Sequence, residues 1–149
     1  MTIDATIDTL QMLHRTVTGV KLAPAKYPGS INSADLPLVI VWPGRATTKF
    51  VTAKGAIIRS ERTYSVRVFM EAVGQSDYDT PVQDGITLLQ RLLEMYMRQA
   101  ELVRGYPMIT SVSDSGLIAG TELLTYAGSF YRGFICELTV LELLVPVGA

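Results

Sequence analysis

The chain has 149 residues, of which 48% are hydrophobic and 18% are charged, and its formal net charge is -1. This length predicts one domain, residues 1–149, that can bury a core without disulfides or a metal, and the apolar composition excludes disorder. The near-neutral charge argues against a dedicated nucleic-acid-binding surface. The fraction of charged residues is below the usual value of about 25%, which favours buried contacts between subunits.

Cys136 is the only cysteine, so an internal disulfide is impossible, which fits a reducing compartment. The N-terminal residues have no basic segment leading into an apolar one, so we expect no signal peptide. The longest apolar run, Leu36 to Trp42, is too short to span a membrane. These features predict a soluble protein of the cytoplasm without membrane contact.

The first part of the chain predicts a helix, a loop and a strand. Residues 3–18 predict a helix because apolar residues recur there at spacings of three and four. Residues 23–37 are rich in Pro, Gly, Ser and Asn and predict a loop, and loops of this length tend to be functional. The apolar run Leu38 to Trp42 predicts a buried strand, and Pro43-Gly44 is expected to end it.

Residues 45–73 predict a β-hairpin that turns at residues 53–55. The returning strand is the clearer half, because apolar side chains fall on every second position from Tyr64 to Met70. A second loop, residues 74–79, is expected to lead into the longest helix of the chain.

Residues 80–105 predict that central helix. Thr80 is a suitable N-cap, Pro81 suits the first helical position, and Gly105 suits the C-terminal stop. Two neighbouring apolar rows cover roughly 200° of the helix, whereas an ordinary surface helix needs about 100°. We therefore expect two apolar neighbours: a sheet on one side, and another helix or another subunit on the other. The rows are Val82, Ile86, Leu89, Leu93, Tyr96, Ala100 and Val103, and Leu88, Leu92, Met95 and Leu102.

The last part of the chain predicts strands joined by turns. Residues 108–112 predict a short strand, 113–116 a turn, 117–126 an extended segment, and 127–129 another turn. Residues 131–144 predict the longest strand, with Phe134, Cys136, Leu138 and Val140 on one face. The predicted fold class is α+β: a mostly antiparallel sheet, with an N-terminal helix and a long central amphipathic helix packed on it.

No residue pattern indicates catalysis or a cofactor site. His14 is the only histidine and is expected to have a surface or packing role. Cys136 lies in an alternating strand, where a free cysteine is usually a small core residue. The chain contains no nucleophile elbow, dinucleotide or phosphate-loop motif and no zinc spacing, so we expect no enzyme and no cofactor.

One acidic cluster begins like a calcium loop. Asp77 and Asp79 have the right spacing, but Pro81 and Leu88 occupy positions where further ligands are required. The simpler interpretation is that these acids and Asp84 surround a helix N-terminus, where negative charge is favourable. We therefore predict no metal site.

The charges are segregated along the chain. Residues 43–62 contain five basic side chains and one acid, and residues 71–84 contain four acids and no base. This distribution of charges could arise by chance, or it could reflect two solvated loops. The same distribution also suits a head-to-tail ring, in which the basic hairpin of one subunit meets the acidic loop of the next. A contact between the basic hairpin and DNA phosphates is a weaker reading, because no stacking aromatics accompany it.

Four segments, in this order, carry a resemblance to a known family. They are LPLVIVWPG, YSVRVFMEAV, TPVQDGITLLQRLLEMY and YAGSFYRGFICELTVLEL, together with the helix and the loop that precede them. In this plan, which covers most of the chain, the sequence resembles the tail terminator, or tail completion, proteins of long-tailed bacteriophages.

The resemblance implies a non-enzymatic structural protein of the virion, located at the tail neck and assembled in the host cytoplasm. Such proteins form a ring, typically a hexamer, at the head-proximal end of the tail. The ring caps polymerisation of the tail tube and joins the tail to the head connector. Its partners would be further copies of itself, the tail tube protein and a head-connector or head-closure protein, and DNA would pass through its channel without specific binding.

With this resemblance, the expected interface residues are Arg45, Lys49 and Lys54 on the hairpin, against the tube or a neighbouring subunit. Asp77 and Asp79 would line the complementary edge. Two alternatives remain. The protein could be another neck component, a head-closure or adaptor protein, or a small ligand- or metal-binding α+β domain with a site near Asp77, Asp79 and Asp114.

Overall fold

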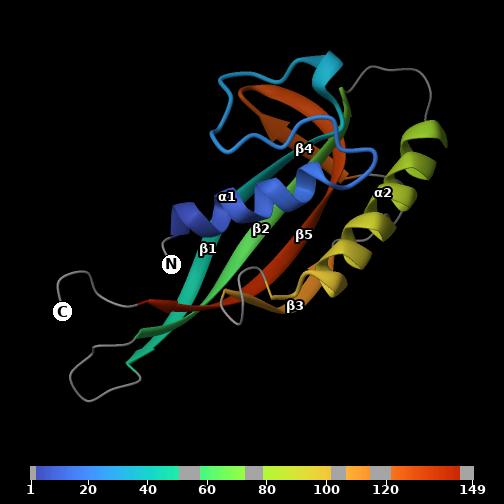
Figure 1. The fold of residues 1–149 in the computed structure, drawn as a ribbon. Helices are drawn as coiled ribbons and strands as arrows, with labels where there is room; N and C mark the ends of the chain where they lie inside the picture. Colours follow the sequence, from blue (N-terminus) through green and yellow to red (C-terminus); the bar gives the residue numbers. More distant parts are fainter. Residues whose placement is uncertain (1–2, 51–57, 73–78, 102–106, 115–121, 145–149) are drawn as a thin grey trace.

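The computed structural model describes residues 3–50, 58–72, 79–101, 107–114 and 122–144 (Figure 1). All strand pairs are antiparallel, in the order β1-β2-β5-β3, and β4 pairs with the N-terminal part of β5. The elements are α1 (Ile3–Arg15), η1 (Ser33–Asp35), β1 (Leu38–Phe50), β2 (Ile58–Ala72), α2 (Asp79–Arg98), β3 (Met108–Asp114), β4 (Glu122–Tyr126) and β5 (Ser129–Leu144).

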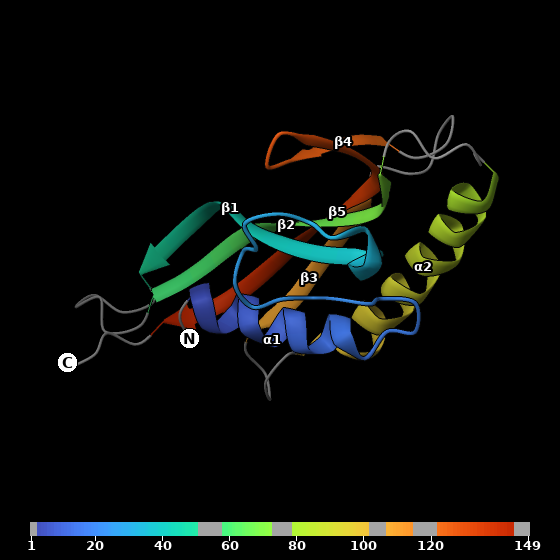
Figure 2. The same cartoon turned by 90° about the horizontal axis from the view of Figure 1, so that it is seen from above.

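The expected fold class is wrong in the part that it gives to the helices. Strands hold more of the described residues than helices do; α1 lies across one face of the sheet, and α2 contributes side chains to the same core from the side of β3 (Figures 1 and 2). The central helix stands beside β3, the edge strand, and its N-terminal end diverges from the sheet (Figure 2). The chain is a mostly antiparallel sheet with one short N-terminal helix and one central helix.

The predicted end of the central helix is also wrong. The helix ends at Arg98, because Glu101 already forms an antiparallel bridge with Met108 and the Ile109 amide donates to the Ala100 carbonyl at 2.7 Å. Backbone pairing with β3 therefore ends the helix several residues before Gly105, where the sequence predicts its C-terminal end.

Strand β1 does not end at Pro43-Gly44 but continues to Phe50. A β-bulge between Pro43 and Ala46 absorbs the irregularity, and the Arg62 Nη1 donates to the Gly44 carbonyl at 2.8 Å. β1 is an edge strand, where a proline does not break a ladder on its outer side. The predicted hairpin 45–73 is confirmed in its two strands, whereas its turn at 53–55 and the loop 74–78 lie outside the described residues.

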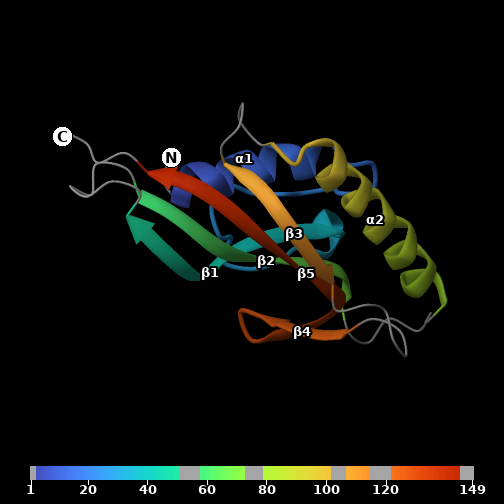
Figure 3. The ribbon, with the colours of Figure 1, turned by 90° about the horizontal axis from the view of Figure 1, so that it is seen from below.

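The sheet has a core on each face. The predicted row Phe134, Cys136, Leu138 and Val140 is fully buried beneath the helices, as expected from its alternation. A second core on the other face lies under the loop before β1 and the β4–β5 hairpin (Figure 3). It contains Leu36, Leu38, Ile40, Phe69, Leu124 and Tyr131.

His14 has a packing role, and it connects the two helices. The Gln11 Nε2 donates to the carbonyls of Pro24 and Val39, at 2.8 and 2.9 Å, which leaves Gln11 Oε1 as the acceptor for the His14 Nδ1–H at 2.8 Å. The other ring nitrogen, Nε2, must then accept from the Tyr96 hydroxyl at 2.7 Å. His14 is therefore neutral, and burial lowers its pKa from 6.5 to about 3.

The buried histidine predicts a pH dependence of stability. Because the pKa is near 6.5 in the unfolded chain and about 3 in the fold, the unfolded state binds the proton more readily between these values. The contribution of neutral His14 to the free energy of unfolding is complete above pH 6.5 and falls by about 1.4 kcal/mol per pH unit below it. The free energy of unfolding, measured with urea, should be about 2 kcal/mol higher at pH 6.5 than at pH 5, and His14→Gln should remove most of that difference. An unchanged difference in the variant would contradict this assignment.

Candidate subunit interface

Two of the three predicted basic residues lie at one end of the sheet. Arg45 and Lys49 are exposed on the outer half of β1, whereas Lys54 lies outside the described residues. We call residues 45–50 and 58–62 the arm. The arm is at the end of the sheet farthest from α2, beside the C-terminal end of β5 (Figure 1).

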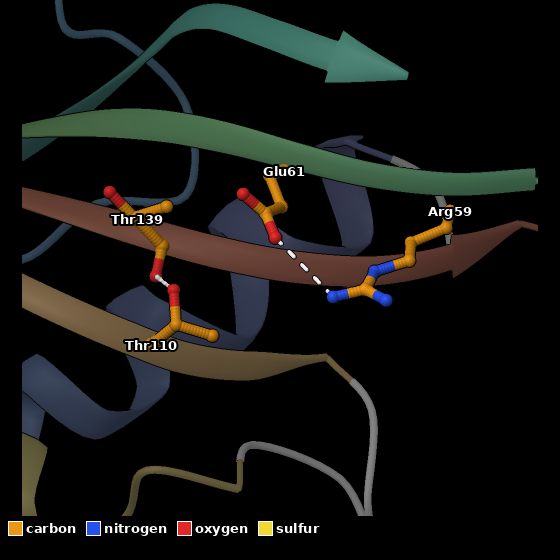
Figure 4. Close-up of polar contacts among 4 residues, drawn as sticks. All are labelled: Arg59, Glu61, Thr110 and Thr139. Carbon is orange, nitrogen blue, oxygen red and sulfur yellow. Dashed lines mark hydrogen bonds and ion pairs between the residues drawn. The ribbon is translucent and has the colours of Figure 1, made fainter. Parts of the chain in front are cut away.

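The arm places like charges together. Lys49 stands directly opposite Arg59 in the β1–β2 register, an arrangement that destabilises a strand pair. The only acid of the arm, Glu61, forms an ion pair with Arg59 at 3.5 Å, but both side chains are about half exposed, so the pair contributes at most about 1 kcal/mol (Figure 4). The arm is thus a net basic surface.

The face that carries Arg59 and Glu61 also carries apolar side chains, because Leu143 stands opposite Arg59 and Leu141 opposite Glu61 in the β2–β5 register. Figure 4 shows that Thr110 of β3 donates to the Thr139 carbonyl of β5, at 3.2 Å, next to this ion pair. Thr47, Lys49, Arg59 and Glu61 line only a small hollow of 190 Å³. Lys49, with Pro43 and the bulge, also protects an edge strand against unwanted pairing, which is a structural reason for part of this charge.

The predicted acidic residues begin the central helix. Asp79 is its first residue, but the side chain of Asp79 and the whole of Asp77 lie outside the described residues. Asp84 is exposed on α2. The start of α2 and the arm lie at opposite ends of the molecule, so the described residues at the start of α2 and those of the arm are far apart within one chain (Figure 1).

No described cluster supports a metal or a reactive thiol. Within the described residues, no group of three His, Cys, Asp or Glu side chains could hold a metal ion. Cys136 is buried, and burial, followed by the charge of Asp114, raises its pKa to about 12, so the thiol stays protonated. Asp114 itself is exposed at the end of β3. It is at least 30 residues along the chain from Asp79 and Asp84, which are at the start of α2.

The central helix leaves part of its apolar surface uncovered. Its row Leu88, Leu92, Met95 and Tyr96 is buried in the core, but Ile86 is 45% and Met97 81% exposed. Leu89 and Leu93 are half-buried and border the core. We call Ile86, Leu89, Leu93 and Met97 the α2 flank.

The α2 flank faces away from α1. On the α1 side of the helix, the Arg91 Nη1 donates to the Thr18 carbonyl at 2.9 Å. Ile86 and Met97 are more than about 100° around the helix from Arg91. Among the described residues, the apolar neighbours of α2 are the sheet and α1, which share one core with it. The α2 flank extends beyond this core and has no helix beside it (Figures 1 and 3).

A groove lies at the other end of the molecule, between the start of α1, the loop after it and β1. It has a volume of 530 Å³, and its lining combines apolar side chains with two acids and one lysine. The Tyr27 hydroxyl, which donates to the Val41 carbonyl at 2.8 Å, and its ring, which stacks on Trp42, fix one wall. We call it the N-terminal groove; its lining is Ile3, Asp4, Ile7, Asp8, Ala25, Lys26, Tyr27 and Pro43.

One buried acid was not expected. Glu142 of β5 is 1% exposed, and its Oε1 accepts from Thr6 of α1 at 2.9 Å and from the Tyr64 hydroxyl at 2.5 Å. Burial, and then this hydrogen bond, raise the pKa of Tyr64, so the phenol keeps the proton that it donates. The alternation of β5 does contain the signal, because Glu142 continues the row from Phe134 to Val140.

Comparison with known families found no family model that matches the chain, and comparison with curated proteins found no match either. Neither helix that the structure describes combines the length and the apolar character needed to cross a membrane.

Proposed function

We propose that the protein is a structural subunit of a phage virion, a tail terminator whose copies form a ring, typically a hexamer, at the head-proximal end of the tail. The ring caps the tail tube and joins the tail to the head connector, without enzymatic activity. The identification rests on the order of segments that resembles the tail terminator family.

The observation that carries the assembly part of the proposal is the uncovered α2 flank. Ile86 and Met97 expose apolar surface that the fold of one chain does not use. Large exposed apolar side chains in a row are typical of protein contacts, and methionine adapts well to such surfaces. The basic arm adds a charged surface at the opposite end, as a head-to-tail contact requires.

Solution mass measurement followed by negative-stain imaging with purified tail tubes tests this function. We expect rings in solution, or rings seated on tube ends. A monomer at every concentration that leaves tube ends unoccupied would contradict it. Binding to the portal side, with no capping of tubes, would instead identify another neck component.

The charge segregation predicts a second result. Replacing both Asp77 and Asp79 with lysine should block ring assembly and leave the monomer folded, because the basic arm of the neighbour would then meet positive charge. Assembly is read by solution mass and folding by thermal melting. An intact ring in the double variant would exclude the pairing of these acids with Arg45, Lys49 and Lys54.

A further inference from the structure

The chain has one apolar surface that protrudes and another that is hollowed. The α2 flank is convex, and its Met97 is 81% exposed, more than any other large apolar side chain in the described residues. The N-terminal groove is concave, and Ile3, Ile7, Tyr27 and Pro43 line it. A flexible methionine is well suited to fill an irregular apolar groove.

The charges beside these surfaces are also complementary. Arg98 follows Met97, and its ion pair with Glu94, at 3.6 Å, joins two side chains that are 76% and 61% exposed. Such a pair contributes little, so Arg98 can exchange it for another carboxylate. Asp4 and Asp8 are exposed on one face of α1 and line the groove together with Lys26, so the charged side chains of the lining carry a net charge of about -1.

The two surfaces cannot meet within one chain. The start of α1 lies toward the arm, whereas α2 stands at the opposite side of the molecule in both views (Figures 1 and 2). Because the surfaces differ, their contact is heterologous, and a repeated heterologous contact gives a closed ring or an open filament. A second copy of the same chain is therefore an occupant that brings an apolar side chain, Met97, and a basic one, Arg98, to an apolar groove with a net acidic lining.

We propose that the α2 flank of one copy packs into the N-terminal groove of the next copy, with Met97 in the groove and Arg98 beside Asp4 and Asp8. This inference rests on the proposed ring and names the residues of its subunit contact. In this contact the acids of α1 in one copy meet Arg98 of the other copy. They are a second set of acidic contact residues, separate from the acids at the start of α2.

Cysteine cross-linking of the full chain tests the pairing. Cys136 is buried, so engineered cysteines are the reactive thiols. In a Met97→Cys, Asp8→Cys double variant, a short bis-maleimide should give a ladder of covalent oligomers. An equal mixture of the two single variants should give one cross-linked dimer. The matched control is Met97→Cys with Leu123→Cys, because Leu123 is 63% exposed on β4, which lies on the opposite face of the sheet from α1, and it should give no ladder.

The outcomes separate this contact from the ring itself. If the Met97–Asp8 variant forms rings as the wild type does and gives no ladder, the contact is wrong and the proposed function stands. If the variant is folded but no longer forms rings, the two residues are needed for assembly, as the contact predicts. If Met97→Cys alone cross-links to itself, the interface is isologous and the contact is again wrong. If the wild-type protein forms no ring in solution or on tubes, the proposed function fails first.

Discussion

Replacing Ile86 and Met97 with glutamate should convert the assembled protein into folded monomers. Both side chains are exposed in the single chain, so the substitutions remove little packing from the core. In the assembly, each buried apolar side chain contributes about 1.5–3 kcal/mol, and glutamate at the same place would bury a charge. We expect association to weaken at least about 100-fold, measured by solution mass over a dilution series.

Leu123→Glu is the control for this pair. Leu123 is 63% exposed on β4 and belongs to neither the α2 flank nor the N-terminal groove. It should leave both assembly and thermal melting unchanged. If the Ile86, Met97 double variant assembles as the wild type does, the α2 flank is not a subunit contact.

Gly133→Ala should produce the largest loss of stability from a single methyl group. Gly133 lies where β5 pairs with Phe69 of β2 on one side and with Glu122 of β4 on the other. A Cβ atom there would be 1.9 Å from the Val68 carbonyl oxygen and 2.9 Å from Leu124 Cδ1. Since a backbone atom must move, we expect a loss of about 3 kcal/mol or more in the free energy of unfolding, measured with urea.

The matched control is Gly29→Ala. A Cβ atom at Gly29 would have no heavy atom within 4 Å. Its effect should stay within about 0.5 kcal/mol, as for an ordinary surface substitution. Equal stabilities of the two variants would mean that β2 and β4 do not approach β5 as closely as described.

The strands were predictable because their alternation is local. The row from Phe134 to Val140 and the hairpin of β4 and β5 follow directly from the sequence. The turn at Ala127 and Gly128, with φ of 48° and 81°, is of the type that tight hairpins favour. Alternation survives tertiary packing, because one face of each strand must be buried.

The boundaries were less predictable because distant residues set them. The helix signals at Gly105 are reasonable, but the bridge between Glu101 and Met108 ends α2 earlier. Pro43 suggested a strand end, yet on an edge strand a bulge accommodates it. The contribution of the helices to the fold was overestimated. The amphipathic pattern of a helix shows how wide its apolar surface is, but it does not show which part of the protein covers that surface.

Only part of the candidate interface could be expected from the sequence. The sequence predicted the basic residues Arg45 and Lys49, which the structure places on the arm, and a second apolar neighbour for the central helix, whereas Lys54, Asp77 and the side chain of Asp79 lie outside the described residues. It could not bring Ile3, Tyr27 and Pro43 into one groove, because three separate segments form it. Nor could it join His14 to Tyr96, which is 82 residues away.

The mass of the purified protein in solution, followed by imaging of tail tubes mixed with it, tests the central claim most directly. We expect a mass that is a multiple of the 16.3 kDa chain and rings that cover one end of each tube. A stable 16.3 kDa monomer that leaves both tube ends free would contradict the assignment as a tail terminator.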